Sequence, residues 1–253
     1  MIDTHCHLTY KGLKEICEEV IEDARRQMDA IITCGLPEDA GEALALAESN
    51  PGFVHVSLGI HPTDVIALSD EEIEGYAKFI ERNKRRIIAV GEIGLDYHWI
   101  TDEKERERTK AVFAQFLELA KELKKPVILH SRKAEEDVLN LIIENDIKLA
   151  TFHSFTGNIT LARRIIEEGF FISLNTNIKN SKNSKKIAAK LPLEQMLTET
   201  DAPFLSPYPG KVNTPQNVKL VLEYIAKLRG MRAEEVDDVI KENCEALFGF
   251  KFS

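Results

Sequence analysis

The sequence alternates between short apolar runs and longer amphipathic segments over most of its length, and this alternation limits the folds open to it. Eight runs rich in β-branched residues begin on average about 28 residues apart. Parallel strands that are covered on both faces have this near-continuous apolar character. Eight such strands in 253 residues predict a closed (β/α)8 barrel, the TIM barrel of the α/β class. The runs begin at residues 1, 30, 53, 86, 126, 148, 170 and 196.

The segments between the runs have helical periodicity. In four clear cases apolar residues recur at i, i+3 and i+4, and charged residues fill other positions. An open, doubly wound sheet is the alternative arrangement, but no GxGxxG motif follows an early strand. Because no low-complexity linker or change in composition divides the chain, we predict a single domain over residues 1–253. The four amphipathic segments span residues 13–28, 112–120, 218–228 and 233–247.

The composition is typical of a soluble globular protein. Hydrophobic residues make up 43% of the chain and charged residues 30%, and no apolar stretch of about 18 residues predicts a membrane span. The N-terminus lacks the basic and apolar segments of a signal peptide. Four scattered cysteines without a CxxC pair indicate reduced thiols and a cytoplasmic protein. Nothing in the sequence indicates an obligate protein partner.

Histidines and carboxylates stand where the predicted strands end. Catalytic residues of a TIM barrel lie at this end of its strands, and the two histidines of the first run share one face because they are two residues apart. Each residue alone has an ordinary interpretation, such as a hydrogen-bonded histidine or a helix-capping carboxylate. Together, among otherwise apolar strands, they favour a metal site. The six residues are His5, His7, Glu92, His130, His153 and Asp201.

Six ligands exceed the three that one catalytic zinc ion takes, and they suit two divalent ions about 3.5–4 Å apart. We expect Glu92 to bridge the ions, because its strand lies between two groups of ligands. The histidines of the first strand and Asp201 would complete one ion, and His130 and His153 the other. A water between the ions would be acidified, and Asp201 is placed to accept its second proton. This ligand set leaves Mg²⁺, Mn²⁺ and Zn²⁺ open.

Six ordered motifs resemble the signatures of the TatD family of metal-dependent deoxyribonucleases, within the amidohydrolase-like barrels. They span residue 2 to about 217, with a weaker match in NCEALFGF. The resemblance implies a TIM barrel, a divalent metal centre at the six residues above, and hydrolysis of DNA, commonly as a 3′→5′ exonuclease on single strands. Glu92 stands where many superfamily members carry a modified lysine, which argues against a urease-like or dihydroorotase-like amidase. The motifs are DTHCHL, GIHP, GEIGLDY, HSR, HSFTG and ETDAPFL.

Three further residues are candidates for substrate contact. His61 ends the third strand and can face the same cavity. Arg132 can bind a phosphate oxygen through a charge-assisted hydrogen bond, or it can form a salt bridge at the rim. Tyr97 can stack on a base, as can His98 and Trp99, which follow it, or these side chains can pack under their loop.

Several features bear on the substrate. A net charge of −9 is unusual for a protein that binds nucleic acid over a broad surface, so a polyanion would need a local positive site such as bound metal. The lysine-rich residues 179–190 can line a path for a phosphate backbone or form the solvated start of a helix. The resemblance breaks at Lys133, where an acidic residue is common. It breaks again at KVNTP, residues 211–215, where Arg-Asn-Glu-Pro is typical.

Three functions follow from these features. The first is a two-metal deoxyribonuclease that acts on single-stranded ends. The second is a metallohydrolase of another ester, such as a misacylated tRNA or a small molecule, which the acidic charge and the altered 211–215 loop keep open. The third is a noncatalytic metal-binding scaffold, which the complete ligand set disfavours.

Overall fold

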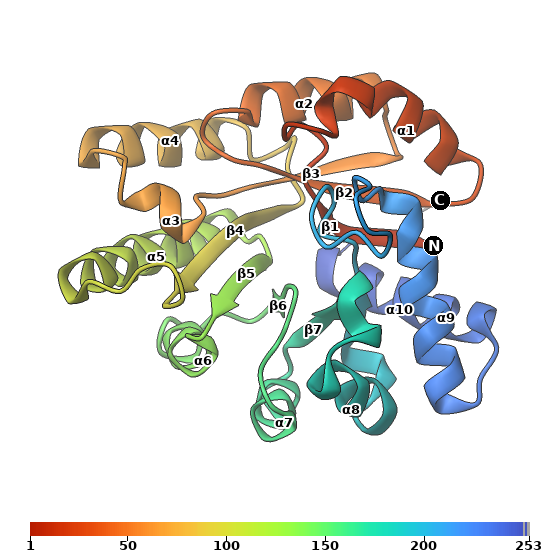
Figure 1. Cartoon of the computed structure of the whole chain (residues 1–253). Coiled ribbons are helices and arrows are strands. Elements are labelled where there is room, and N and C mark those ends of the chain that lie inside the picture. The colour runs from red at the N-terminus through yellow and green to blue at the C-terminus, as the bar shows by residue number, and fades with distance from the viewer. Residues whose placement is uncertain (250, 252–253) are drawn as a thin grey trace.

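Eight parallel strands pair in chain order, from β1 to β8, into one sheet (Figure 1). The computed structural model describes residues 1–249 and 251. Each strand begins within a different apolar run, so the predicted α/β barrel with eight strands is confirmed. The strands are β1 (Ile2–Cys6), β2 (Ala30–Gly35), β3 (Val54–Leu58), β4 (Ala89–Asp96), β5 (Val127–Arg132), β6 (Ala150–Phe152), β7 (Phe171–Leu174) and β8 (Met196–Thr198).

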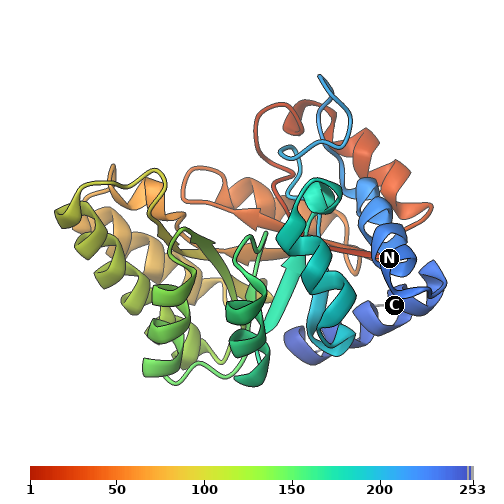
Figure 2. The same cartoon turned by 60° about the horizontal axis from the view of Figure 1, so that its bottom comes forward.

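Helices surround the strands, as Figures 1 and 2 show from two directions. Buried apolar side chains of the helices and strands form two clusters, and the larger one contains most of the core. The α-helices are α1 (Cys17–Arg25), α2 (Ala40–Ser49), α3 (Pro62–Val65), α4 (Asp70–Arg82), α5 (Glu103–Leu123), α6 (Glu135–Glu144), α7 (Ile159–Glu167), α8 (Lys182–Lys190), α9 (Val218–Arg229) and α10 (Ala233–Phe248). Short 3₁₀ helices are η1 (Lys14–Ile16), η2 (Thr176–Lys179), η3 (Leu193–Gln195) and η4 (Pro215–Asn217).

The periodicity places all four predicted helices correctly but not all of their ends. The helix predicted over 13–28 divides into η1 and α1 and ends at Arg25. The periodic segment 112–120 is only the part of α5 that faces the sheet, since α5 begins nine residues earlier, at Glu103. Asp102 fixes that start, because its side chain accepts hydrogen bonds from the backbone N–H groups of Lys104 and Glu105.

The first and last strands meet through backbone hydrogen bonds just past their ends. The N–H of His7 donates to the carbonyl of Ala202 over 2.7 Å, and the N–H of Asp201 donates to the carbonyl of His5 over 3.0 Å. These bonds bring the segment after β8 alongside β1 at the C-terminal end of the barrel. Three of the predicted metal ligands are therefore fixed relative to one another by main-chain contacts.

Two other predictions concern the chain as a whole. The four cysteines are buried and unpaired, as the sequence predicts. Among the described residues, every helix is too short or too polar to cross a lipid bilayer.

Candidate metal centre

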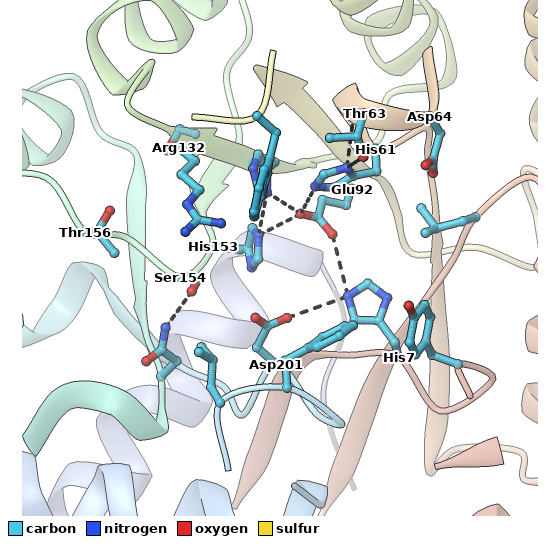
Figure 3. A pocket seen from close by; sticks show the side chains of 18 of the residues that line it. His7, His61, Thr63, Asp64, Glu92, Arg132, His153, Ser154, Thr156 and Asp201 are labelled. Atoms are coloured by element: carbon cyan, nitrogen blue, oxygen red, sulfur yellow. Dashed lines mark hydrogen bonds and ion pairs between the residues drawn. The ribbon is translucent and has the colours of Figure 1, made fainter. Parts of the chain in front are cut away.

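The six predicted metal ligands converge at the C-terminal ends of the strands. They come from β1, β4 and β5 and from the residues just after β1, β6 and β8. All are largely buried, and none has a side chain more than 16% exposed. Figure 3 shows four of them, His7, Glu92, His153 and Asp201, facing one another across the floor of a cavity.

The first group of donors surrounds a point between β1 and the segment after β8. The Nε2 atoms of His5 and His7 are 3.2 Å apart. They lie 3.4 and 3.7 Å from Glu92 Oε2, and 3.8 and 3.6 Å from Asp201 Oδ1. A tetrahedral ion with bonds of about 2.1 Å needs donors about 3.4 Å apart. His5, His7 and Asp201 therefore fit a divalent cation in both chemistry and spacing, and Glu92 Oε2 lies within 3.7 Å of both histidine nitrogens.

The second group of donors gathers at the other oxygen of the same carboxylate. Glu92 Oε1 lies 2.6 Å from His130 Nδ1 and 2.8 Å from His153 Nε2, and these two nitrogens are 3.4 Å apart. His61 Nε2 lies 3.8 Å from the same oxygen. Distances of 2.6 and 2.8 Å are those of direct hydrogen bonds, so an ion here would replace those bonds. Glu92 thus lies between His7 and His153 (Figure 3), and His5, Glu92 and His153 also lie close enough together to hold one ion.

Two further carboxylates, which the sequence did not predict, contact the other ring nitrogens of His130 and His153. Asp96 Oδ2 lies 3.0 Å from His130 Nε2. Glu199 Oε1 lies 3.4 Å from His153 Nδ1 and accepts a 2.6 Å hydrogen bond from the N–H of Ser154. Such partners orient a metal-binding imidazole and fix its tautomer. The sequence signal for Asp96 is its even spacing from a predicted ligand, because it lies four residues after Glu92. In an extended chain, residues an even number of positions apart point to the same face.

The carboxylates at the floor of the cavity stay ionised despite their burial. Burial raises the pKa of Glu92, but the charge of His153 and hydrogen bonds with the histidines outweigh it and hold the pKa well below its usual value. Burial also raises the pKa of Asp201, and the hydrogen bond with His7 and nearby histidine charge lower it overall. Conversely, burial lowers the pKa of His153, but the charges of Glu92 and Glu199 and the hydrogen bonds with them outweigh it and raise the pKa well above its usual value. A site with these charges favours cations, and a metal ion would compete there with protons.

The cavity above this floor has a volume of about 820 Å³, within the range of small-molecule pockets. Loops from the C-terminal ends of the strands form its wall. Residues that line it and carry labels in Figure 3 include Thr63, Asp64, Arg132, Ser154 and Thr156.

The three predicted substrate-contact residues are placed differently. His61 and Arg132 line the cavity. Among the described residues no carboxylate lies within 4.0 Å of Arg132, so the salt-bridge interpretation is wrong. Tyr97 does not line the cavity: its hydroxyl donates to Asp137 over 2.5 Å, and its ring lies 4.5 Å below the guanidinium of Arg106. Stacking of Tyr97 on a base is therefore corrected to packing under the loop, whereas Trp99, a second candidate of the same predicted segment, lines the cavity.

The structure also shows the conformation of the 211–215 loop and of the lysine-rich residues 179–190. Within 211–215, Asn213 is buried and donates to the carbonyls of Thr200 and Phe204 over 2.9 and 2.7 Å, which fixes the loop after β8. The lysine-rich segment forms the end of η2 and α8. Its lysines are absent from the described lining of the cavity.

Comparison with known proteins identifies the family of the chain. The model of the family described as TatD related DNase matches residues 2–249. An uncharacterized metal-dependent hydrolase of Methanocaldococcus jannaschii is 40% identical over 96% of this chain and 94% of its own length. Deoxyribonuclease TATDN3 of Homo sapiens is 31% identical over 98% of this chain and 94% of its own.

A solved structure shows the same architecture. The crystal structure of YjjV, a TatD homologue from Escherichia coli K12, superposes with a TM-score of 0.90 and 32% identity, and covers 99% of this chain and 98% of that one. The match over nearly the whole chain and the buried cluster of histidines and carboxylates lead to one conclusion. The chain belongs to the TatD-related DNase family of metal-dependent hydrolases.

Proposed function

We propose that this protein hydrolyses phosphodiester bonds of DNA, as a 3′→5′ exonuclease on single-stranded ends, with two divalent metal ions. The observation that carries the proposal is Glu92, whose two carboxylate oxygens face two separate groups of donors at the floor of one cavity. Two-metal sites of this kind serve in-line displacement at phosphorus. The names of the family and of the human relative support DNA as the substrate.

The donors divide between the ions as follows. His5, His7 and Asp201 would hold one ion, His130 and His153 the other, and Glu92 both. Divalent ions at these positions would acidify a water and neutralise charge on the phosphate. Histidine and carboxylate together admit Mg²⁺, Mn²⁺ and Zn²⁺, and these are the ions to test.

The protein's own side chains would then position the phosphate and move the proton. Asp201 is ionised and lines the cavity, so it is the group that accepts the proton of the attacking water. Glu92 keeps the two halves of the centre together, and Asp96 and Glu199 hold the histidine rings in place. The unpaired guanidinium of Arg132 would bind a phosphate oxygen. We place the enzyme in the cytoplasm, because its buried cysteines are unpaired.

A second candidate function is hydrolysis of another ester, a misacylated tRNA or a small molecule. The 211–215 loop favours it, since Val212 is exposed where the family typically carries arginine. Burial and the charge of Glu38 also raise the pKa of Asp64, at the cavity wall, to about 6. An acidic wall is less suited to a polyanion than to a neutral substrate.

The test is digestion of single-stranded DNA labelled at its 5′ end, with Mg²⁺, Mn²⁺, Zn²⁺ or a chelator. We expect a ladder that shortens from the 3′ end and that disappears with the chelator and in Glu92→Ala. Glu122→Gln is the matched control, because it removes an exposed carboxylate remote from the centre. Intact DNA under every ion, with metal still bound, would contradict the nuclease proposal and favour the second candidate.

A further inference from the structure

The largest side chain in the protein stands at the cavity wall with most of its surface in water. Trp99 is the only tryptophan of the chain, is 65% exposed, and lines the cavity. Large aromatic side chains usually bury most of their surface, so a tryptophan exposed beside a candidate active site indicates a ligand surface.

The backbone that carries Trp99 is fixed to the candidate metal centre. Asp96 Oδ1 accepts hydrogen bonds from the N–H groups of His98 and Trp99, over 2.8 and 2.9 Å. The other oxygen of Asp96 lies 3.0 Å from His130 Nε2. One carboxylate therefore sets the position of a predicted metal ligand and the start of the loop that presents the indole.

A cation lies directly beside this indole. The guanidinium carbon of Arg132 is 5.5 Å from the centre of the Trp99 ring, and Arg132 is the one arginine or lysine among the described residues that line the cavity. Its guanidinium has no carboxylate partner within 4.0 Å in the described part of the chain. A guanidinium without a carboxylate partner, next to an indole that is 65% exposed, matches the phosphate and base of one nucleotide.

A second aromatic surface stands on the other side of the cavity. Phe204 and Tyr10 line it, are 42% and 39% exposed, and have ring centres 5.0 Å apart. The ring of Phe204 is also 5.9 Å from that of His7, in the first group of donors. The aromatic pair therefore adjoins one half of the metal centre, as Trp99 and Arg132 adjoin the other.

The order of the strands sets these two surfaces opposite each other. Trp99 follows β4 and Arg132 ends β5, whereas Tyr10 follows β1 and Phe204 follows β8. In an eight-stranded barrel β4 lies four positions from β8, and β5 four positions from β1. Figure 3 shows the same separation, with Arg132 and His7 on opposite sides of Glu92.

We infer that Trp99 with Arg132, and Phe204 with Tyr10, are two base-stacking subsites that hold an unpaired strand across the metal centre. The inference rests on the proposed nuclease function and explains its preference for single strands. A base can stack on a side chain at each wall only if it is unstacked and unpaired, which a duplex does not allow. The scissile phosphate then lies between the two subsites, above Glu92.

Trp99 provides a direct probe, because its fluorescence is the only tryptophan signal of the protein. The ligands are a thymidine oligonucleotide with a hydrolysis-resistant phosphorothioate at its 3′-terminal linkage, an abasic oligonucleotide of equal length, and a blunt duplex, each with Mn²⁺. We expect saturable quenching by the first ligand and much weaker quenching by the other two.

Variants separate stacking from charge. By anisotropy of a labelled oligonucleotide, Trp99→Ala and Phe204→Ala should each raise Kd for the thymidine oligonucleotide about five- to 100-fold, the usual range for loss of one stacked base. Both should leave Kd for the abasic ligand within about twofold. Arg132→Gln should weaken both ligands and reduce the salt dependence of binding by about one phosphate contact. Tyr208→Ala is the matched control, since Tyr208 is exposed but is not part of the described lining.

The outcomes distinguish this inference from the proposed function. DNA digestion with unquenched Trp99, or unchanged Kd in Trp99→Ala, would overturn the stacking subsites and leave the nuclease function standing. Quenching and the expected Kd changes without digestion would support the subsites and remove the nuclease function. If Trp99→Ala weakened binding of the abasic and thymidine ligands equally, the inference would be overturned. Trp99 would then affect binding by supporting the structure of the site, and not by stacking on a base.

Discussion

Glu92 is the residue on which both halves of the candidate centre depend. Its Oε2 faces the histidines of β1 and its Oε1 faces His130 and His153. The histidines in turn depend on carboxylates behind them. Because an outer carboxylate contacts no substrate, its loss should affect metal binding before it affects chemistry.

Glu199→Gln tests this outer contact at the level of one residue. The amide keeps the size of the side chain but loses the charge next to His153 Nδ1. We expect metal affinity to fall about 10- to 100-fold, measured by titration with a competing chelator, and activity to return at high metal concentration. Glu122→Gln should behave like the wild type. Unchanged metal affinity in Glu199→Gln would show that Glu199 only supports the N–H of Ser154.

At this scale the sequence predicted which histidines and carboxylates converge better than it predicted the loop residues. His5, His7 and Asp201 could be found because the end of each strand follows from its apolar run, and Glu92 because it is the one carboxylate within the apolar run of β4. Asp96 and Glu199 were accessible in principle, through their even spacing from predicted ligands. Which of Tyr97, His98 and Trp99 lines the cavity was not accessible from the sequence, because the placement of Tyr97 depends on a hydrogen bond to a distant aspartate, Asp137, on α6.

At the scale of elements, the close approach of β4 and β5 positions Glu92 and His130. Gly94 makes that approach possible: its φ is +147°, and a Cβ there would lie 2.0 Å from the carbonyl oxygen of His130. Two backbones meet at this glycine, so no flexible side chain can move away. By contrast, Gly75 lies on the exposed face of α4, and a Cβ there would have nothing within 4 Å.

This contrast predicts opposite effects of the same substitution. Gly94→Ala should lower the free energy of unfolding by at least about 1–3 kcal/mol, through overpacking and backbone strain. Gly75→Ala should raise it by about 0.5–1 kcal/mol, because alanine is the better helix former. Urea unfolding followed by circular dichroism measures both. A Gly94→Ala protein as stable as the wild type would show that β4 and β5 lie farther apart than the structure has them.

Strand positions were predictable because each apolar run contains one strand. Helix ends were less so. The helix α5 begins before its periodic segment. Its first turns are rich in charged residues and have no repeating apolar positions, so periodicity does not detect them. Its true start depends on the side-chain hydrogen bonds of Asp102, which a periodicity argument does not include.

At the scale of the whole molecule, an ion-pair cluster links β1 and β2 to α10. Lys241 Nζ on α10 lies 2.9 Å from Asp29, just before β2, and 3.2 Å from Asp237. The amino group of Met1 pairs with the same two aspartates. The cluster therefore links β1, β2 and α10 through charge.

This cluster predicts a pH dependence of stability. Burial raises the pKa of Asp29, but the Met1 amino group and Lys241 outweigh it and hold the folded-state pKa below its usual value. The unfolded chain therefore binds its proton first as pH falls, so the contribution is complete above about pH 4 and is lost below it. Asp29→Asn should be less stable than the wild type at pH 7, by thermal unfolding, and the difference should shrink toward pH 3. A difference that is constant with pH would contradict the ionic account.

The central claim, a two-ion centre bridged by Glu92, is tested most directly by anomalous diffraction from crystals loaded with Mn²⁺. The account predicts two peaks, about 3.5–4 Å apart, one among His5, His7 and Asp201 and one beside His130 and His153, with Glu92 between them. A single peak, or peaks away from Glu92, would contradict it.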